Sequence, residues 1–68
     1  MINIILNGES HKIAAGLVIA GLLENLDLDP TKVAVERNLE IVPKTTYQDV
    51  ELLNGDRLEI VYFMGGGK

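Results

Sequence analysis

RLEIVYFMGGGK, residues 57–68, is the stretch that decides how the rest of the sequence is organised. Residues 57–63 are rich in β-branched and aromatic side chains, which is typical of a strand. Glycines follow at 65–67, where they cannot pack a core and would each lose much conformational entropy if ordered. We therefore expect residues 65–68 to form a flexible tail that reaches into another molecule. A frayed terminus or a cloning remnant is the alternative.

The start of the chain predicts a hairpin. Ile2, Ile4 and Leu6 alternate with their neighbours as in a strand with one well-buried face. Asn7-Gly8 follows, the strongest two-residue hairpin signal, because a type I′ turn needs positive φ at both positions. Residues 9–14 are therefore expected to return antiparallel to the first strand.

One helix is predicted at residues 16–28. Val18 stands where a Ser, Thr or Asp would cap the helix, so a cap hydrogen bond worth about 1 kcal/mol is missing. Gly21 lies inside the helix and costs up to about 1 kcal/mol relative to alanine. Leu17 and Ala20 fall outside the apolar stripe and are expected to pack on a neighbouring loop, with a small exposed partner site as the alternative. The core-facing stripe recurs at helical spacing: Ile19, Leu22, Leu23 and Leu26.

The middle of the chain predicts two short strands and a covering loop. One strand begins at Val33 and meets a turn at Asn38, and a second strand, residues 39–42, stops at Pro43. Residues 44–53 are mostly loop with one helical turn, and a tight turn follows at 54–56. Three side chains of the loop are expected to cover the core: Tyr47, Val50 and either Leu52 or Leu53.

The predicted order of strand, strand, helix, strand, short strand and strand indicates an α+β fold in one domain. The first and last strands are the most apolar, so we expect them to pair at the centre of a mixed sheet of four or five strands. The helix is a crossover that covers one face of this sheet. Leu58 and Ile60 should point into the core, which leaves Glu59, Val61 and Phe63 on a face open to solvent or a partner.

Composition excludes several classes of function. The chain has 68 residues, no cysteine and a net charge of −4. A domain this small buries only about 60% of the surface of its unfolded chain, so a dense aliphatic core has to stabilise it. The acidic charge disfavours binding to a nucleic-acid backbone, and no apolar run approaches the roughly 18 residues that span a bilayer. The first residues lack the features of a signal peptide, so we expect a cytoplasmic protein that binds neither nucleic acid nor membrane.

An internal catalytic or metal site is not expected. One histidine, His11, cannot build a metal centre alone, a chain this short leaves little room for a pocket, and no helix follows the glycines to help them bind phosphate. The remaining candidate is the carboxylate of a C-terminal glycine, which is unhindered, ionised at neutral pH and able to attack the α-phosphate of ATP. The carboxylates of the second half are expected on a solvated surface: Glu36, Glu40, Asp49, Glu51, Asp56 and Glu59.

Two segments, together with the glycines, resemble the ThiS family of ubiquitin-like sulfur carriers of thiamine (thiazole) biosynthesis. The segments are VAVERNLEIVP at 33–43 and GDRLEIV at 55–61, and the first hairpin turn and the Leu22-Leu23 helix fit the same pattern. The resemblance covers essentially the whole chain. It implies a β-grasp domain over residues 1–64 and a protein co-substrate instead of an enzyme.

The resemblance also implies a reaction sequence. A ThiF-like, E1-like adenylyltransferase uses ATP to adenylate the terminal glycine, a cysteine desulfurase relay supplies sulfur, and the resulting thiocarboxylate donates it to thiazole synthase, ThiG. The carrier itself binds no cofactor and no metal. The glycine pair of the family falls on Gly66 and Gly67, with Gly67 as the adenylate and thiocarboxylate site. The surface that partners bind is expected at Glu59, Val61, Phe63, Met64 and Gly65.

Lys68 departs from the family pattern, because it turns the Gly67 carboxylate into an amide. Removal of Lys68 by a protease, an origin of Lys68 in cloning, and a protein that is not a working carrier are three interpretations. Two other functions stay open at this stage. One is a sister carrier for molybdopterin or amino-acid biosynthesis, and the other is a ubiquitin-like interaction module or modifier without sulfur chemistry.

Overall fold

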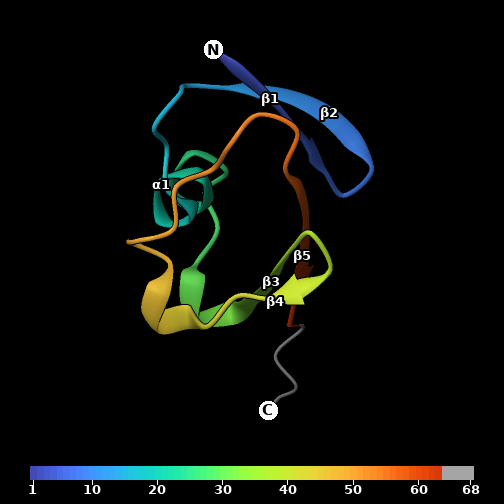
Figure 1. Cartoon of the computed structure of the whole chain (residues 1–68). Coiled ribbons are helices and arrows are strands. Elements are labelled where there is room, and N and C mark those ends of the chain that lie inside the picture. The colour runs from blue at the N-terminus through green and yellow to red at the C-terminus, as the bar shows by residue number, and fades with distance from the viewer. Residues whose placement is uncertain (64–68) are drawn as a thin grey trace.

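The computed structural model describes residues 1–63, which form one sheet and one helix (Figure 1). The strands are β1 (Ile2–Leu6), β2 (Glu9–Ile13), β3 (Val33–Arg37), β4 (Glu40–Ile41) and β5 (Arg57–Tyr62). The helix is α1 (Ile19–Asn25), and two short 3-10 turns, η1 (Pro30–Lys32) and η2 (Lys44–Thr46), flank the β3–β4 hairpin. The predicted order of elements is confirmed. The predicted tail, residues 65–68, lies outside the described residues.

Strand β5 lies at the centre of the sheet. The five strands follow the order β2-β1-β5-β3-β4. β5 runs parallel to β1 and antiparallel to β3, so the mixed sheet and the central pairing of the first and last strands are confirmed. Helix α1 lies against one face, and the strands curve around it (Figure 1). This is the α+β, β-grasp arrangement, with one covered face and one open face.

Asn7 joins the first hairpin to the central strand. Asn7 and Gly8 have φ angles of 50° and 86°, the left-handed pair that a type I′ turn requires. The side chain of Asn7 then continues β1 alongside β5, because its Nδ2 donates to the carbonyl of Ile60 and its Oδ1 accepts from the Ile60 amide at 2.8 Å. The turn was predictable from Asn7-Gly8, whereas the bonds to Ile60 depend on which strand lies beside β1.

Helix α1 begins later than predicted. Val18 is extended and bridges to the loop before β5, so the helix starts at Ile19 instead of residue 16. No side chain caps this end, as the sequence indicated. The loop replaces the cap, since the amides of Ile19 and Ala20 donate to the carbonyls of Val50 and Tyr47 at 3.0 and 2.8 Å.

The helix also ends before residue 28, because Asp27 adopts a left-handed conformation with φ of 60°. The amides of Asp27 and Leu28 donate to the carbonyls of Glu24 and Leu23, the Schellman pattern that closes a helix. Leu28 packs against the core, whereas Leu26 is 36% exposed. The prediction that Leu26 belongs to the core stripe was therefore wrong.

Gly21 makes room for Leu17. A β-carbon at Gly21 would lie 2.7 Å from Cδ1 of Leu17, well inside the normal carbon–carbon contact distance. Leu17 and Ala20 are partly buried and pack against the core. Their backbones also bond to the neighbouring loop, where we expected their contacts, at Leu52 and Tyr47. The packing of Leu17 therefore offsets the cost of a glycine inside the helix.

The core lies between α1 and the covered face of the sheet, and residues 47–52 close it. Tyr47 and Leu52 are buried while Leu53 is exposed. Leu52, and not Leu53, is therefore the leucine of this loop that covers the core. The Tyr47 hydroxyl is buried without a hydrogen bond to the described residues. Burial raises the pKa of Tyr47, and the nearby backbone of Val35 offsets only part of that effect. The largest fully buried side chains are Ile4, Ile19, Leu23, Leu52, Leu58, Val33 and Val35.

Replacing Tyr47 by phenylalanine is expected to leave the stability unchanged or raise it by about 1 kcal/mol. A buried hydroxyl without a partner gives up its hydrogen bonds to water on folding and gains none in return, so its removal relieves this cost. Urea unfolding followed by circular dichroism measures the difference. Tyr62→Phe is the matched control, since Tyr62 is 47% exposed and its ring lies outside the core. A Tyr47→Phe chain less stable by more than about 1 kcal/mol would mean that the hydroxyl is hydrogen-bonded after all.

Candidate functional site

The open face of the sheet carries the described side chains that the sequence assigned to partner binding. Glu59 is exposed, and Val61 and Phe63 keep 54% and 50% of their surface in water. On the opposite face of the same strand, Leu58 is fully buried and Ile60 packs against the core. The predicted alternation of faces along β5 is therefore confirmed. The rest of the predicted site lies outside the described residues: Met64, Gly65, Gly66 and Gly67.

This face extends across β3 and β4. Paired residues of neighbouring strands share a face, and the register pairs Val61 with Ala34, Glu59 with Glu36, and Glu36 with Ile41. Ile41 is 66% exposed. Ile41 could not be assigned from the sequence, because only the register of β4 shows which face it occupies. We call six residues the open-face patch: Ala34, Glu36, Ile41, Glu59, Val61 and Phe63.

Two acidic side chains face each other within the open-face patch. Glu36 and Glu59 stand directly opposite on β3 and β5, and among residues 1–63 neither forms a salt bridge. Like charges in this arrangement destabilise a sheet by about 0.2 to 1 kcal/mol. Exposed apolar side chains beside unpaired carboxylates suit a protein partner that presents apolar and basic groups together.

The chain leaves the sheet beside this patch. The amide of Phe63 donates to the carbonyl of Lys32 at 2.9 Å, which extends the β3–β5 ladder one residue past Tyr62. The ammonium of Lys44 lies 5.4 Å from the centre of the Phe63 ring. Phe63 is therefore held through both its backbone and its ring, and the next residue of the sequence is Met64 of the predicted partner-binding site.

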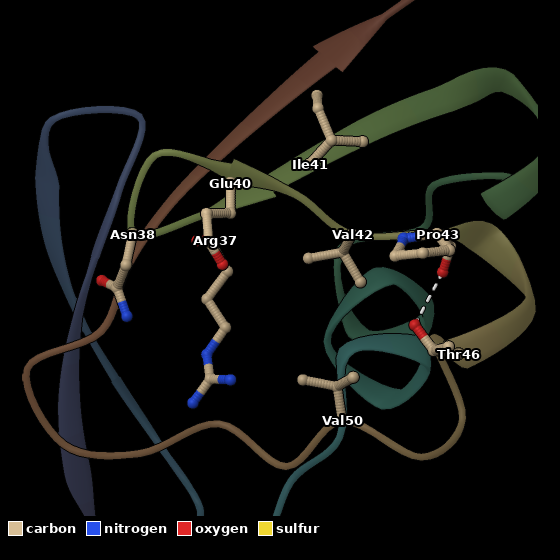
Figure 2. Close-up of a pocket in the computed structure, with 8 residues that line it drawn as sticks. All are labelled: Arg37, Asn38, Glu40, Ile41, Val42, Pro43, Thr46 and Val50. Atoms are coloured by element: carbon tan, nitrogen blue, oxygen red, sulfur yellow. Dashed lines mark hydrogen bonds between the residues drawn. The ribbon is translucent and has the colours of Figure 1, made fainter.

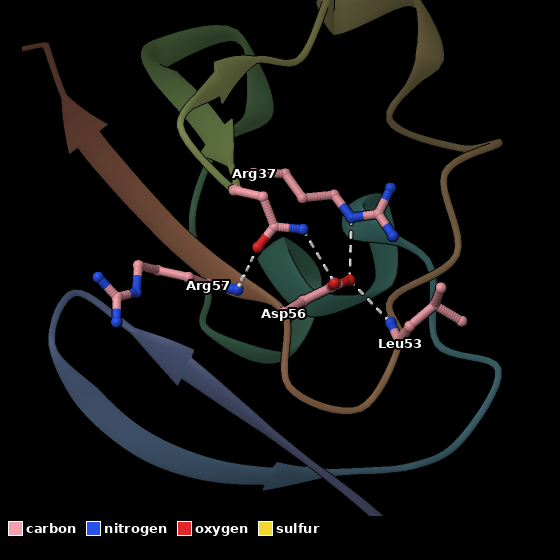
Figure 3. A network of polar contacts seen from close by, with 5 residues as sticks. Arg37, Leu53, Asp56 and Arg57 are labelled. Carbon is pink, nitrogen blue, oxygen red and sulfur yellow. Dashed lines mark hydrogen bonds and ion pairs between the residues drawn. The ribbon is translucent and has the colours of Figure 1, made fainter.

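Asp56 joins the two segments that are most distinctive in the sequence (Figure 3). Its Oδ2 accepts from Nε of Arg37 at 2.9 Å and from the amide of Leu53 at 2.8 Å, and its Oδ1 accepts from Nδ2 of Asn38. The Oδ1 of Asn38 in turn accepts from the amide of Arg57. Asp56 is only 6% exposed, so its prediction as a solvated carboxylate was wrong. These residues link the β3–β4 hairpin to the start of β5.

The partners of Asp56 keep it ionised. Burial by itself would raise the pKa of Asp56, but the hydrogen bonds from Leu53, Arg37 and Asn38 and the charge of Arg37 together lower it below the usual 3.8. A buried carboxylate with this many donors holds structure together and is a poor acid or base at neutral pH.

A pocket of about 270 Å³ lies beside this network (Figure 2). Val42 and Val50 point toward each other across it, while Ile41 points away. The Arg37 guanidinium reaches the pocket but is already paired with Asp56. The pocket therefore offers apolar walls and a paired cation, and its described lining places no nucleophile next to a base.

A second hollow, of about 460 Å³, adjoins the C-terminal end of α1 and is lined in part by Glu24, Asp27 and Asp29. This hollow is wide open to solvent, so it does not have the enclosed shape of a small-molecule site. In residues 1–63, no three His, Cys, Asp or Glu side chains are grouped to hold a metal ion. Within the same residues, no helix has the length and apolar character of a membrane span.

Comparison with known proteins gives a consistent result. A family model described as the ThiS family matches residues 4–67. A thiazole synthase of Paramagnetospirillum magneticum is 52% identical over 64 residues, which are 94% of this chain and 20% of that protein. The sulfur carrier protein ThiS of Bacillus subtilis is 49% identical over 49 residues, 72% of this chain and 74% of that protein. The chain thus spans about a fifth of the length of the thiazole synthase that it matches.

A solved structure shares the fold. The crystal structure of the thiamine biosynthesis protein ThiS from Geobacter metallireducens matches with a TM-score of 0.84 and 32% identity. The match covers 97% of this chain and 100% of that chain. The similarity therefore includes the sheet and the helix together, and the predicted β-grasp fold is confirmed.

Replacing Asp56 by asparagine is expected to destabilise the fold by about 2 kcal/mol or more, because Arg37 and two further donors lose a charged acceptor. The change should also remove a pH dependence. A carboxylate whose pKa is lowered on folding contributes stability above its unfolded value near 3.8, and this contribution is lost as the pH falls through the folded pKa. Urea midpoints measured from neutral pH into the acid range check both effects.

Asp49→Asn is the matched control for this experiment. Asp49 is exposed, so the same chemical change there should alter the stability by less than about 0.5 kcal/mol. If Asp56→Asn loses stability in acid as steeply as the unsubstituted chain, the network is not the source of the acid sensitivity.

Proposed function

This chain belongs to the ThiS family, and we propose that it is a sulfur carrier protein for thiazole formation in thiamine biosynthesis, with the sulfur held as a thiocarboxylate on Gly67. The observation that carries the proposal is the family match, which includes the central strand and the glycine pair and ends at Gly67. A sulfur carrier is not itself a catalyst. We infer that this chain is the co-substrate of the enzymes that load and unload it.

Two displacement steps load the carrier in this proposal. The Gly67 carboxylate attacks the α-phosphate of ATP, which forms an acyl-adenylate and releases pyrophosphate. Hydrosulfide then attacks the acyl carbon, AMP leaves with one of the carboxylate oxygens, and the thiocarboxylate remains. Glycine suits both steps, because it has no β-carbon beside the acyl carbon and an extended glycine segment can enter a narrow channel. ATP belongs to the activating enzyme, so the carrier needs no cofactor of its own.

The activating partner in this proposal is a ThiF-like adenylyltransferase that binds the open-face patch. Val61 and Ile41 offer exposed apolar contact area, and Glu36 and Glu59 offer charge for basic groups. The contact should be small and transient, because one carrier must leave its activator for its acceptor. A cysteine desulfurase relay would supply the sulfur as a persulfide. Its attack on the acyl-adenylate forms an acyl disulfide, and a thiol then cleaves the S–S bond, is oxidised to a disulfide and releases the thiocarboxylate. We place these steps in the cytoplasm, where ATP is available.

The acceptor in this proposal is thiazole synthase. The relative from P. magneticum bears that name and contains a segment similar to this chain as 20% of its length. A carrier-like segment within a protein named thiazole synthase supports a direct contact between the two folds. The name thiazole synthase also favours thiazole formation, over molybdopterin or amino-acid biosynthesis, as the use of the sulfur.

Lys68 has to be removed before Gly67 can react, because an amide carbonyl has no free carboxylate with which to attack ATP. The family match includes Gly67 and leaves Lys68 out, which supports Gly67 as the reactive residue. The intact mass of the protein from its native cell would show whether a protease performs the removal.

The chain ending at Gly67, incubated with the ThiF-like enzyme, ATP and hydrosulfide, is expected to gain about 16 Da, the difference between one sulfur and one oxygen atom. Intact-mass spectrometry measures the change. The chain that retains Lys68 is the control and should keep its mass. An unchanged mass of the Gly67-ended chain beside an active enzyme would contradict sulfur loading, and Gly67 joined to a lysine side chain would indicate a modifier.

Val61→Asp is expected to lower kcat/KM for adenylation at least about tenfold, because it places a charge inside an apolar contact. Its unfolding midpoint should change little, since Val61 is 54% exposed. Pyrophosphate release measures the rate. Leu39→Asp is the control, because Leu39 is 83% exposed at the tip of the β3–β4 hairpin and lies outside the open-face patch. Equal losses in both variants would contradict docking through the patch.

A further inference from the structure

The side chain of Lys44 holds together the segments around the end of β5. Its ammonium donates to the carbonyl oxygen of Val33 at 2.6 Å, and the carbonyl oxygens of Pro30 and Thr31 lie at 3.3 and 3.4 Å. The same ammonium lies 5.4 Å from the centre of the Phe63 ring. One side chain of η2 therefore contacts η1, the first residue of β3 and the residue that follows β5.

The register of the sheet explains why a side chain is needed at this point. The pairing of β3 with β4 continues to the hydrogen bond from the Val42 amide to the Val35 carbonyl. Two residues further along each strand, the next hydrogen-bonded pair in that register would be Val33 and Lys44. The chain turns away into η2 after Pro43 before this pair is formed. The Val33 carbonyl would therefore lack the strand partner that the ladder gives Val35. The ammonium of Lys44 supplies the missing donor, and its charge strengthens the bond.

The start of β3 is held from its other edge by β5. Successive carbonyls of a strand point to opposite edges, and that of Lys32 accepts the Phe63 amide while that of Val33 accepts Lys44. The ammonium also attracts the face of the Phe63 ring through a cation–π contact. Loss of the ammonium would therefore loosen both the backbone and the ring of Phe63.

We propose that Lys44 is a positioning residue for loading the carrier, which fixes the point at which the chain leaves the sheet, four residues before Gly67. This inference rests on the proposed function, since that point matters only if Gly67 must meet a reactive phosphate in a partner. A fixed starting point limits the positions that a glycine tail has to search, and group transfer depends steeply on how often the reacting atoms are aligned. Lys44 acts through Phe63 and is not a catalytic residue.

Three variants test the proposal. Lys44→Met keeps the aliphatic stem and removes the ammonium, while Lys44→Arg keeps the charge on a longer, planar head group. Lys32→Met is the matched control, because it removes the same charge from an exposed lysine of the adjacent segment. Circular dichroism establishes that each variant is folded. If Lys44→Met is not folded, Lys44→Gln takes its place.

Two measurements separate structure from positioning. Deuterium exchange at the Phe63 amide of the full chain should be about tenfold faster in Lys44→Met, because the hydrogen bond to Lys32 opens more often. In chains ending at Gly67, kcat for adenylation by the ThiF-like enzyme should fall about tenfold in Lys44→Met while KM stays within about twofold. Lys44→Arg should recover most of this loss, and Lys32→Met should match the unsubstituted chain.

Each outcome decides the proposal. A kcat that is unchanged in Lys44→Met overturns the positioning role, and faster exchange at Phe63 without a change in kcat would make Lys44 a purely structural contact. An equal fall in Lys32→Met overturns it as well, because the effect would then follow charge alone. If the unsubstituted chain is not adenylated, the proposed function fails and the positioning role falls with it. A loss confined to Lys44→Met supports both.

Discussion

Asp56 is the residue at which the two halves of the sheet are joined. Its backbone carbonyl accepts the Ile5 amide of β1 at 2.9 Å, and its carboxylate binds the β3–β4 hairpin through Arg37 and Asn38. β5 begins at the next residue. The bonds of Asp56 therefore fix the strands on both sides of β5, β1 and β3, at the point where β5 starts. A buried charge is costly unless it is paired and hydrogen-bonded, and these donors come from segments that are in place only when the sheet is closed. The carboxylate thus couples the hairpin, the turn and the central strand.

The sheet has two faces with different properties. Its covered face stabilises the domain, whereas the open-face patch keeps features that cost stability, such as Glu36 facing Glu59. The β3–β4 hairpin adds another cost, because Leu39 has a φ of 73° and is 83% exposed. Such a conformation is unfavourable for a leucine, and burial does not compensate for it here. A carrier that must be recognised by successive partners has a reason to keep the facing carboxylates of the open-face patch, whereas nothing in the structure explains the cost at Leu39.

What could be predicted from the sequence depended on how local each feature is. The first hairpin, the alternation along β5 and the uncapped start of α1 follow from neighbouring residues and were predicted. The extent of α1, the exposure of Leu26 and the burial of Asp56 were wrong, because they depend on distant partners. Arg37, for example, lies 19 positions from Asp56. At the site, the exposure of Val61 followed from alternation, whereas the place of Ile41 on the open face and the contact of Lys44 with Val33 required the register of β4.

The position of β5 has a consequence for how the protein is made. β5 is the last strand of the described chain and the centre of the sheet, so β1 and β3 are synthesised before the strand that lies between them. Both central pairings must wait until residues 57–62 have left the ribosome, and contacts between such distant segments form late. A chain broken off before β5 would lack its centre and be exposed to cellular proteases. Folding itself therefore selects molecules that were synthesised at least through residues 57–62.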